Sequence, residues 1–157
     1  MFISGFPGIG KSHFCEHNSL NTHDSDSSSY SKLPDGSPNP NFIDDYFEHL
    51  ENLQYIPGLM IMVSTHEAVL AELKSRGMNY CVVIPEESLH DEYMRRYKER
   101  GSPQSFIDLI SSNWYMWLRD IKQKHNCFEL KSGQTLTDFI IETYETGHDG
   151  TNAMNFK

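Results

Sequence analysis

The feature that most constrains this chain is a glycine-rich segment close to its first residue. Residues 5–12 read Gly-Phe-Pro-Gly-Ile-Gly-Lys-Ser, which satisfies every specified position of the phosphate-binding loop pattern. The segment follows a short predicted strand that begins at Phe2, and it opens a predicted helix, which is the context that the pattern requires. The residues predicted to bind the cofactor here are Gly5, Pro7, Gly8, Ile9, Gly10, Lys11 and Ser12.

The chemistry of such a loop predicts ATP and Mg²⁺ as the cofactors. Its glycines allow backbone N–H groups to turn toward one centre, and the helix that follows adds unpaired N–H donors and the positive end of its dipole. Lys11 is expected to reach the β- and γ-phosphates, and the Ser12 hydroxyl is expected to ligate Mg²⁺. The alternative is an accidental glycine turn, which chance would produce in about 1% or fewer of chains of this length.

The order of apolar segments predicts an α/β fold. Short apolar runs alternate with helical patterns, which is typical of a three-layer P-loop kinase fold with a parallel sheet of about five strands and helices on both faces. The predicted strands are 2–5, a short strand ending at 24, 59–63, 80–84 and 127–130. One predicted helix opens at Lys11, and the others begin after caps at Asn39, Ser64, Ser88, Ser102 and Thr135.

The length of 157 residues suits one domain. We predict a P-loop kinase domain over residues 1–146 and a frayed tail over 147–157. Within the domain, an acceptor-binding region is expected at about 25–58 and a lid at about 88–103. The first part of the acceptor region, residues 25–40, is rich in Ser, Pro, Asp and Gly, which predicts a mobile loop.

Two carboxylates follow the predicted second strand. Asp24 and Asp26 are separated by one residue, so in extended chain they face the same side. Carboxylates at the C-terminal ends of parallel strands are suited to bind Mg²⁺ and to orient an acceptor. One is therefore expected to hold the metal, Asp24 in our assignment, and Asp26 to contact the acceptor, although sequence alone does not separate their roles. The alternative is a solvated Asp-Ser turn.

A basic cluster lies at the end of the predicted lid helix. Arg96 and Arg100 are four residues apart and would form a two-arginine fork that stabilises the charge of the transferred phosphoryl group. Arg95 is predicted to contact the substrate. The alternative is a solvated helix end whose cations complement the dipole and pair with Glu92 or Glu99.

Together these features resemble the small nucleoside monophosphate kinase-like proteins of bacteriophages and bacteria, which are related to the adenylate and shikimate kinase group. The phosphate loop is the specific part of the resemblance. The remaining segments that carry it are 24–28, 39–49, 63–66, 92–101, 113–114 and 129–134.

The resemblance implies further site residues. It puts Ser64 and His66 in the acceptor pocket and the residues around Gly133 and Gln134 near the donor base, while His66 could equally be a helix residue that faces solvent. The stretch from 11 to 24 is short for this group, which implies a brief first helix or a displaced second strand.

The main functional hypothesis is transfer of the ATP γ-phosphoryl group to a nucleoside or deoxynucleoside monophosphate. A monophosphate acceptor is already anionic, whereas a hydroxyl acceptor, such as a small metabolite or a polynucleotide 5′-hydroxyl, would require an aspartate as general base. A third possibility is a nucleotide-binding regulatory module with little turnover.

Charge and cysteine content limit where the protein is expected to work and what it is expected to bind. A net charge of -9 argues against a protein that coats nucleic acid or an anionic membrane. The longest apolar run, 59–63, is too short to span a bilayer, and Met1 leads directly into the first strand without a secretion signal. An odd number of cysteines, three, favours reduced thiols. We therefore expect a cytoplasmic protein that is a monomer or weak homodimer.

Overall fold

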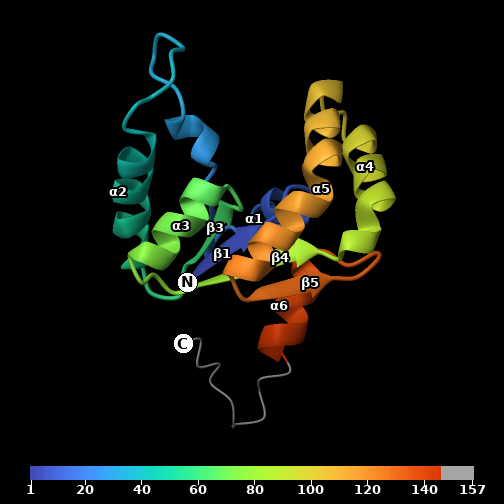
Figure 1. The fold of residues 1–157 in the computed structure, drawn as a ribbon. Coiled ribbons are helices and arrows are strands. Elements are labelled where there is room, and N and C mark those ends of the chain that lie inside the picture. Colours follow the sequence, from blue (N-terminus) through green and yellow to red (C-terminus); the bar gives the residue numbers. More distant parts are fainter. Residues whose placement is uncertain (146–157) are drawn as a thin grey trace. The chain divides into compact units, whose positions relative to one another are not determined.

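A computed structural model describes residues 1–145, the last two of them by their backbone alone (Figure 1). The predicted tail at 147–157 lies outside these residues. The strands are β1 (Phe2–Gly5), β2 (Thr22–Asp24), β3 (Met60–Ser64), β4 (Tyr80–Pro85) and β5 (Cys127–Leu130). The helices are α1 (Lys11–His17), α2 (Phe42–Gln54), α3 (Glu67–Ser75), α4 (His90–Glu99), α5 (Gln104–Lys124) and α6 (Leu136–Glu145), with 3-10 turns η1 (Ser27–Tyr30) and η2 (Glu87–Leu89).

The strands form one five-stranded parallel sheet in the order β2-β3-β1-β4-β5, flanked by helices. Gly5 lies opposite Ser64 in the β1–β3 register, and Asp24 lies opposite Met62 in the β2–β3 register. The α/β fold class predicted from the sequence is therefore confirmed. None of the described helices is both long and apolar enough to cross a membrane.

The described chain divides into two compact units. The N-terminal unit comprises residues 1–5 and 11–81, and the C-terminal unit comprises residues 6–10 and the chain from 82 onward. The phosphate loop therefore contributes to both units. The prediction of one kinase domain over residues 1–146, with an acceptor-binding region and a lid inside it, stays a prediction, and each unit is described by itself.

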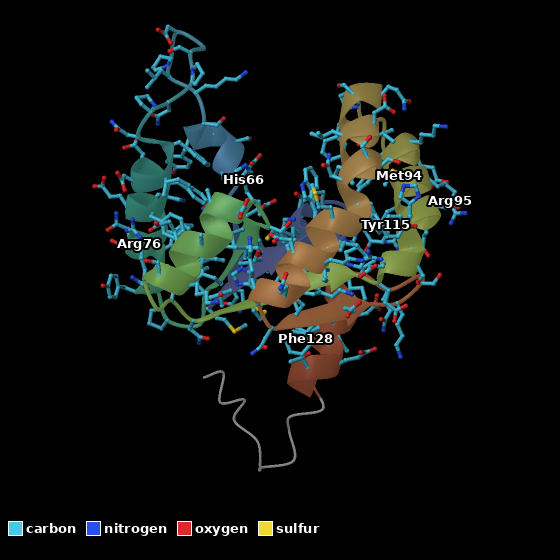
Figure 2. All side chains as sticks on the ribbon, in the orientation of Figure 1. His66, Arg76, Met94, Arg95, Tyr115 and Phe128 are labelled. Atoms are coloured by element: carbon cyan, nitrogen blue, oxygen red, sulfur yellow. The ribbon has the colours of Figure 1, made fainter. Side chains whose placement is uncertain are left out.

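Apolar strands and two amphipathic helices form the core of the N-terminal unit. β1 is fully buried and β3 has a buried apolar centre, as is typical of parallel strands covered by helices. The buried core residues of α2 and α3 are Tyr46, Phe47, Leu50, Val69, Leu70 and Leu73. Arg76 follows α3 and ties it to α2 through an ion pair with Glu51 at 2.7 Å (Figure 2).

Aromatic side chains form the core of the C-terminal unit. The helices α4 and α5 lie side by side (Figure 1). Trp114 of α5 is fully buried, with its ring centroid 5.4 Å from those of Phe6 and Tyr93. Tyr97, one turn after Tyr93 on α4, is also 0% exposed. α4 is therefore held on this core by two buried tyrosines.

Two predicted caps of the N-terminal unit are wrong. α2 begins at Phe42 rather than directly after Asn39. The side-chain oxygen Oδ1 of Asn39 accepts the N–H of Asn41 at 2.9 Å and so forms a local turn instead of a helix cap. The capping box from Ser64 does not form either. Its hydroxyl lies 3.3 Å from that of Ser27, and α3 begins at Glu67.

Of the three helix caps predicted in the C-terminal unit, two are wrong and one is confirmed. Ser88 lies inside η2, so α4 begins only at His90. Ser102 does not cap α5, since Pro103 occupies that position. The pair before α6 is confirmed: the Thr135 N–H and hydroxyl donate to Asp138 at 2.7 and 3.0 Å.

The segment 25–40 contains local structure. Asp26 caps the turn η1, and Lys32 forms an isolated bridge with Pro38. The segment is therefore not structureless, and its mobility stays a prediction.

Candidate functional site

In the N-terminal unit, the end of the phosphate loop contacts the end of β2. α1 begins at Lys11, and the ammonium group of that residue donates to the Gly5 carbonyl. The next residue, Ser12, donates its exposed hydroxyl to Asp24 Oδ2 at 2.6 Å. The brief first helix that the resemblance implied is present, with seven residues. A short connection thus brings the loop serine against an exposed carboxylate.

Ser12 and Asp24 have the chemistry of a magnesium site. Mg²⁺ prefers oxygen ligands, keeps several waters, and is usually bound by one or two carboxylates together with substrate phosphates. A hydroxyl beside one carboxylate fits this pattern. No group of three or more His, Cys, Asp or Glu side chains within the described chain is arranged to hold a metal. By their chemistry, Ser12 and Asp24 could hold Mg²⁺.

The structure separates the two aspartates. Both are exposed and flank buried Ser25, which agrees with the prediction that they share one side of the chain. Asp24 contacts Ser12, whereas Asp26 Oδ1 accepts the N–H of Ser28 at 2.9 Å. Asp26 thus caps the turn after the strand, whereas Asp24 contacts the phosphate loop.

A buried tyrosine fixes the position of this turn. The Ser25 carbonyl accepts the Tyr46 hydroxyl at 2.8 Å, and the Ser25 N–H donates to Met62 at 2.9 Å. Burial raises the pKa of Tyr46 well above its usual value, so its hydroxyl remains a donor at neutral pH. α2 and β3 together hold the backbone between the two carboxylates.

Ser64 and His66 lie at the C-terminal end of β3. The Ser64 carbonyl accepts the Ser4 hydroxyl at 2.9 Å, and its own hydroxyl faces Ser27. His66 is exposed at the start of α3, with its ring 6.5 Å from that of Phe42 and nearly perpendicular to it (Figure 2). An acceptor contact by either residue stays a prediction.

An aromatic group that was not among the predicted site residues adjoins these residues. Tyr30 of η1 lies 5.3 Å from the Tyr46 ring and stacks on His49 at 5.4 Å. Phe42 stacks on Tyr46 at 6.1 Å. Burial, and then the nearby His23, lower the pKa of His49. The helical spacing of 42, 46 and 49 was a detectable signal, whereas nothing in the sequence marked Tyr30.

In the C-terminal unit, residues 6–10 are held by three different elements. The Phe6 N–H donates to Val83 of β4 at 3.0 Å. The Ile9 carbonyl accepts the N–H of Leu136 at 2.8 Å, at the start of α6. The Pro7 carbonyl accepts the Tyr97 hydroxyl of α4 at 2.7 Å. The conformation of the loop therefore depends on residues distant in the sequence.

Glu92 joins two groups of residues that the sequence predicted separately. It accepts from Arg96 at 2.5 Å, from the Ser132 hydroxyl at 2.7 Å and from the Gly133 N–H at 3.1 Å. Arg96 also lies 3.4 Å from the Gln134 carbonyl. The Ser132 hydrogen bond, followed by Gly133 and Arg96, holds the pKa of Glu92 below its usual value. The predicted lid and donor-base residues thus share one network.

The other two arginines have separate partners. Arg100 donates to the Ser102 hydroxyl at 2.8 Å, and its guanidinium carbon lies 4.9 Å from the centre of the Tyr97 ring. Arg95 is labelled on α4 in Figure 2; its side chain is 69% exposed and lies 3.8 Å from Glu99. It also lines an open groove of about 460 Å³ formed by residues of α4 and α5. Within the part of the chain that the structure describes, no hydrogen bond or ion pair joins Arg96 and Arg100 to a common partner, and lid closure stays a prediction.

The close approach of Tyr97 to the loop gives a stability prediction. Gly8 has φ +85°, and a Cβ there would lie 2.7 Å from Tyr97 Cε1, which belongs to a fully buried ring. Gly36 has the same φ but nothing within 4 Å of a Cβ. Both substitutions to Ala carry backbone strain, but only Gly8→Ala adds overpacking, so it should lower the free energy of unfolding by about 1–3 kcal/mol more. Thermal or urea unfolding of the two variants tests this, and equal losses would contradict it.

Comparison with known proteins supports the fold without naming an activity. No protein-family model matches the sequence, and no curated protein matches it significantly. A solved structure of a tunicamycin resistance protein from Deinococcus radiodurans aligns with a TM-score of 0.60 at 16% identity, covering 96% of this chain and 95% of that one. A mouse sulfotransferase, SULT7A1 complexed with PAP, aligns over 94% of this chain and 48% of that one at 11% identity, but its TM-score of 0.32 is too low to indicate a shared fold.

The fold is accordingly that of P-loop α/β proteins, with the glycine-rich loop directly after a strand of the parallel sheet. Over nearly its whole length the chain is similar in fold to the tunicamycin resistance protein. At that level of identity the similarity concerns the fold alone.

Proposed function

We propose that this protein transfers the γ-phosphoryl group of ATP in a Mg²⁺-dependent reaction. The observation that carries the proposal is the 2.6 Å hydrogen bond from Ser12 of the phosphate loop to Asp24 at the end of β2. The loop N–H groups and Lys11 would hold the phosphates. Ser12 and Asp24 would hold Mg²⁺, which when bound neutralises phosphate charge.

The charge of the predicted acceptor region favours a hydroxyl group as the acceptor. Residues 25–58 contain six carboxylates, and their only Lys or Arg is Lys32. An acceptor that carries its own phosphate would need cationic partners, since burial of an unpaired anion is costly. A neutral or cationic molecule with a hydroxyl group is compatible with this region, so the hydroxyl acceptor becomes the better candidate.

Asp26 is the residue we assign as general base for such an acceptor. It is exposed, and one of its oxygens holds η1 in place through Ser28. In the reaction, Asp26 would take the hydroxyl proton while the acceptor oxygen forms a bond to the γ-phosphorus. The bond from that phosphorus to the bridging oxygen breaks and ADP leaves with the electron pair. The products are the phosphorylated acceptor and ADP.

A nucleoside or deoxynucleoside monophosphate is the second candidate. It is supported by the family resemblance and by Arg96 and Arg100, which could bind phosphate oxygens if they exchanged their present partners. Such an acceptor needs no general base, so the two candidates differ in their dependence on Asp26.

Acceptor-dependent release of ADP from Mg-ATP tests both candidates. The panel should contain nucleoside monophosphates, sugars and other small alcohols, a polynucleotide 5′-hydroxyl and, because of the name of the structural neighbour, tunicamycin. We expect turnover with a hydroxyl acceptor. Turnover with monophosphates alone would favour the second candidate, and tight Mg-ATP binding without turnover would favour a regulatory module.

Asp26→Asn distinguishes the chemical role from a structural one. We expect it to lower kcat with a hydroxyl acceptor by about 100-fold or more, because general base catalysis contributes 10²–10⁴-fold. Asp35→Asn is a matched control, since Asp35 accepts the N–H of Ser37 at 2.9 Å just as Asp26 accepts that of Ser28. Equal effects of the two variants, or an unchanged kcat in Asp26→Asn, would contradict the assignment.

A further inference from the structure

The hydrogen bond between Tyr97 and Pro7 has a consequence for the peptide that joins Pro7 to Gly8. The Tyr97 hydroxyl donates to the Pro7 carbonyl at 2.7 Å, and no peptide bond among the described residues is cis. In a trans peptide the carbonyl and the following N–H point in opposite directions. The bond therefore directs the Gly8 N–H away from Tyr97.

The direction of this N–H matters because a phosphate loop binds anions through its amides. Carbonyl groups must turn away from the anion so that successive N–H groups can converge on it. A second peptide of the loop is fixed in the same way, because the Ile9 carbonyl accepts from Leu136 at 2.8 Å and so orients the Gly10 N–H. Two loop amides are thus oriented by residues of α4 and α6.

The surroundings of Tyr97 make it a rigid donor. The side chain is fully buried, and its ring lies edge-on to Phe106 at 5.3 Å. Gly8 allows the ring to approach the loop closely, since any Cβ at that position would overlap it. Burial raises the pKa of Tyr97 well above its usual value, so the hydroxyl keeps its proton over the physiological pH range.

We propose that Tyr97 is a positioning residue for the phosphate-binding loop: by holding the Pro7 carbonyl it presents the Gly8 N–H to a nucleoside triphosphate. The inference rests on the proposed function, because it assumes that the loop binds Mg-ATP. Tyr97 itself contacts the loop and not the reacting atoms. Its hydroxyl therefore governs how tightly the phosphates are held.

A neighbouring tyrosine provides a closely matched control. Tyr93 lies four residues earlier on α4 and is also 0% exposed. Its hydroxyl is buried and makes no hydrogen bond to the loop within the described residues, and the side chain that interacts with it is that of Arg96. Tyr97→Phe and Tyr93→Phe therefore each remove one buried hydroxyl from the same helix, but only Tyr97→Phe removes a contact to the loop.

Titration calorimetry with Mg-ATP and with adenosine tests the proposal. We expect Tyr97→Phe to raise the Kd for Mg-ATP by about 10-fold, the order expected for one hydrogen bond to a charged group, and to leave the Kd for adenosine within about 2-fold. Tyr93→Phe should bind both ligands like the wild type. If Tyr97 had a purely structural role, Tyr97→Phe would weaken the binding of Mg-ATP and adenosine equally, or would change neither.

Two results would overturn the proposal: an unchanged Kd for Mg-ATP in Tyr97→Phe, or equal changes in the two variants. The Gly8 amide resonance of the ¹⁵N-labelled wild type gives a second readout, because it should shift on addition of Mg-ATP and shift less in Tyr97→Phe. A folded wild type that binds no Mg-ATP would instead refute the proposed function, so the two failures are distinguishable.

Discussion

Replacement of Lys11 by Ala is expected to lower kcat/KM for acceptor-dependent ADP release by about 100-fold or more, because electrostatic stabilisation at a transferred phosphoryl group contributes at least this much. Lys11 begins α1 and donates to the Gly5 carbonyl at the other end of the loop. Its ammonium group is therefore held at the phosphate loop before any ligand arrives. Initial rates at varied ATP concentration measure the effect.

Lys124→Ala is the control for this prediction. Lys124 lies at the end of α5 and pairs with Asp120 at 2.9 Å, so its removal subtracts the same charge from the chain at a distance in sequence from the loop. The control should retain wild-type kinetics. If Lys11→Ala kept its activity while remaining folded, the loop would not be the phosphate-binding site.

Asp24→Asn is expected to have the second large effect. The substitution keeps the size of the side chain but removes the charge that would face Mg²⁺ beside Ser12. We expect kcat to fall by about 100-fold and the Mg²⁺ concentration for half-maximal rate to rise by about 10–100-fold, because changing even an outer-shell partner of a metal ligand usually weakens metal binding by this much. Rates measured over a wide range of Mg²⁺ at saturating ATP test both parts.

Asp44→Asn serves as the comparison for Asp24→Asn. Asp44 is 83% exposed on α2 and lies 3.7 Å from Arg76, so its substitution removes the same charge from the same unit. Its Mg²⁺ dependence should match that of the wild type. A shift of equal size in both variants would mean that overall charge, and not a site at Asp24, sets the Mg²⁺ requirement.

The features that the sequence predicted correctly are those encoded over a few neighbouring residues. The loop motif requires only eight consecutive residues, and residues 60–63 of β3 and 80–85 of β4 are uninterrupted apolar runs. The Thr135–Asp138 pair is confirmed because both partners lie within one helical turn. Local chemistry decides such features, so a single sequence is sufficient to predict them.

Two of the predicted caps that failed involve side chains with a competing partner. Asn39 and Ser64 were both expected to cap helices, but Asn39 holds its own turn and Ser64 meets Ser27, which lies 37 residues away. The few residues around a predicted cap do not show whether its side chain will bond to another group instead. Each of these helices therefore begins later than the cap residue indicated.

The contacts that organise the candidate site are mainly long-range. Tyr97 bonds to Pro7 over 90 residues, and Glu92 bonds to Ser132 over 40. No sequence motif predicts either pair, because spacing along the chain does not determine which distant side chains meet in the folded protein. Arg96 is an example: its position on a helix was predicted from the sequence, but the network that joins it through Glu92 to Ser132 and Gly133 is visible only in the structure.

The central claim is that the loop formed by residues 5–12 binds Mg-ATP, and equilibrium titration of the full chain by calorimetry tests it most directly. The account predicts saturable binding of Mg-ATP to one site in the wild type and at least about 10-fold weaker binding in Lys11→Ala, with both proteins folded by circular dichroism. Equal affinity in the two proteins, or no binding to the folded wild type at millimolar Mg-ATP, would contradict it.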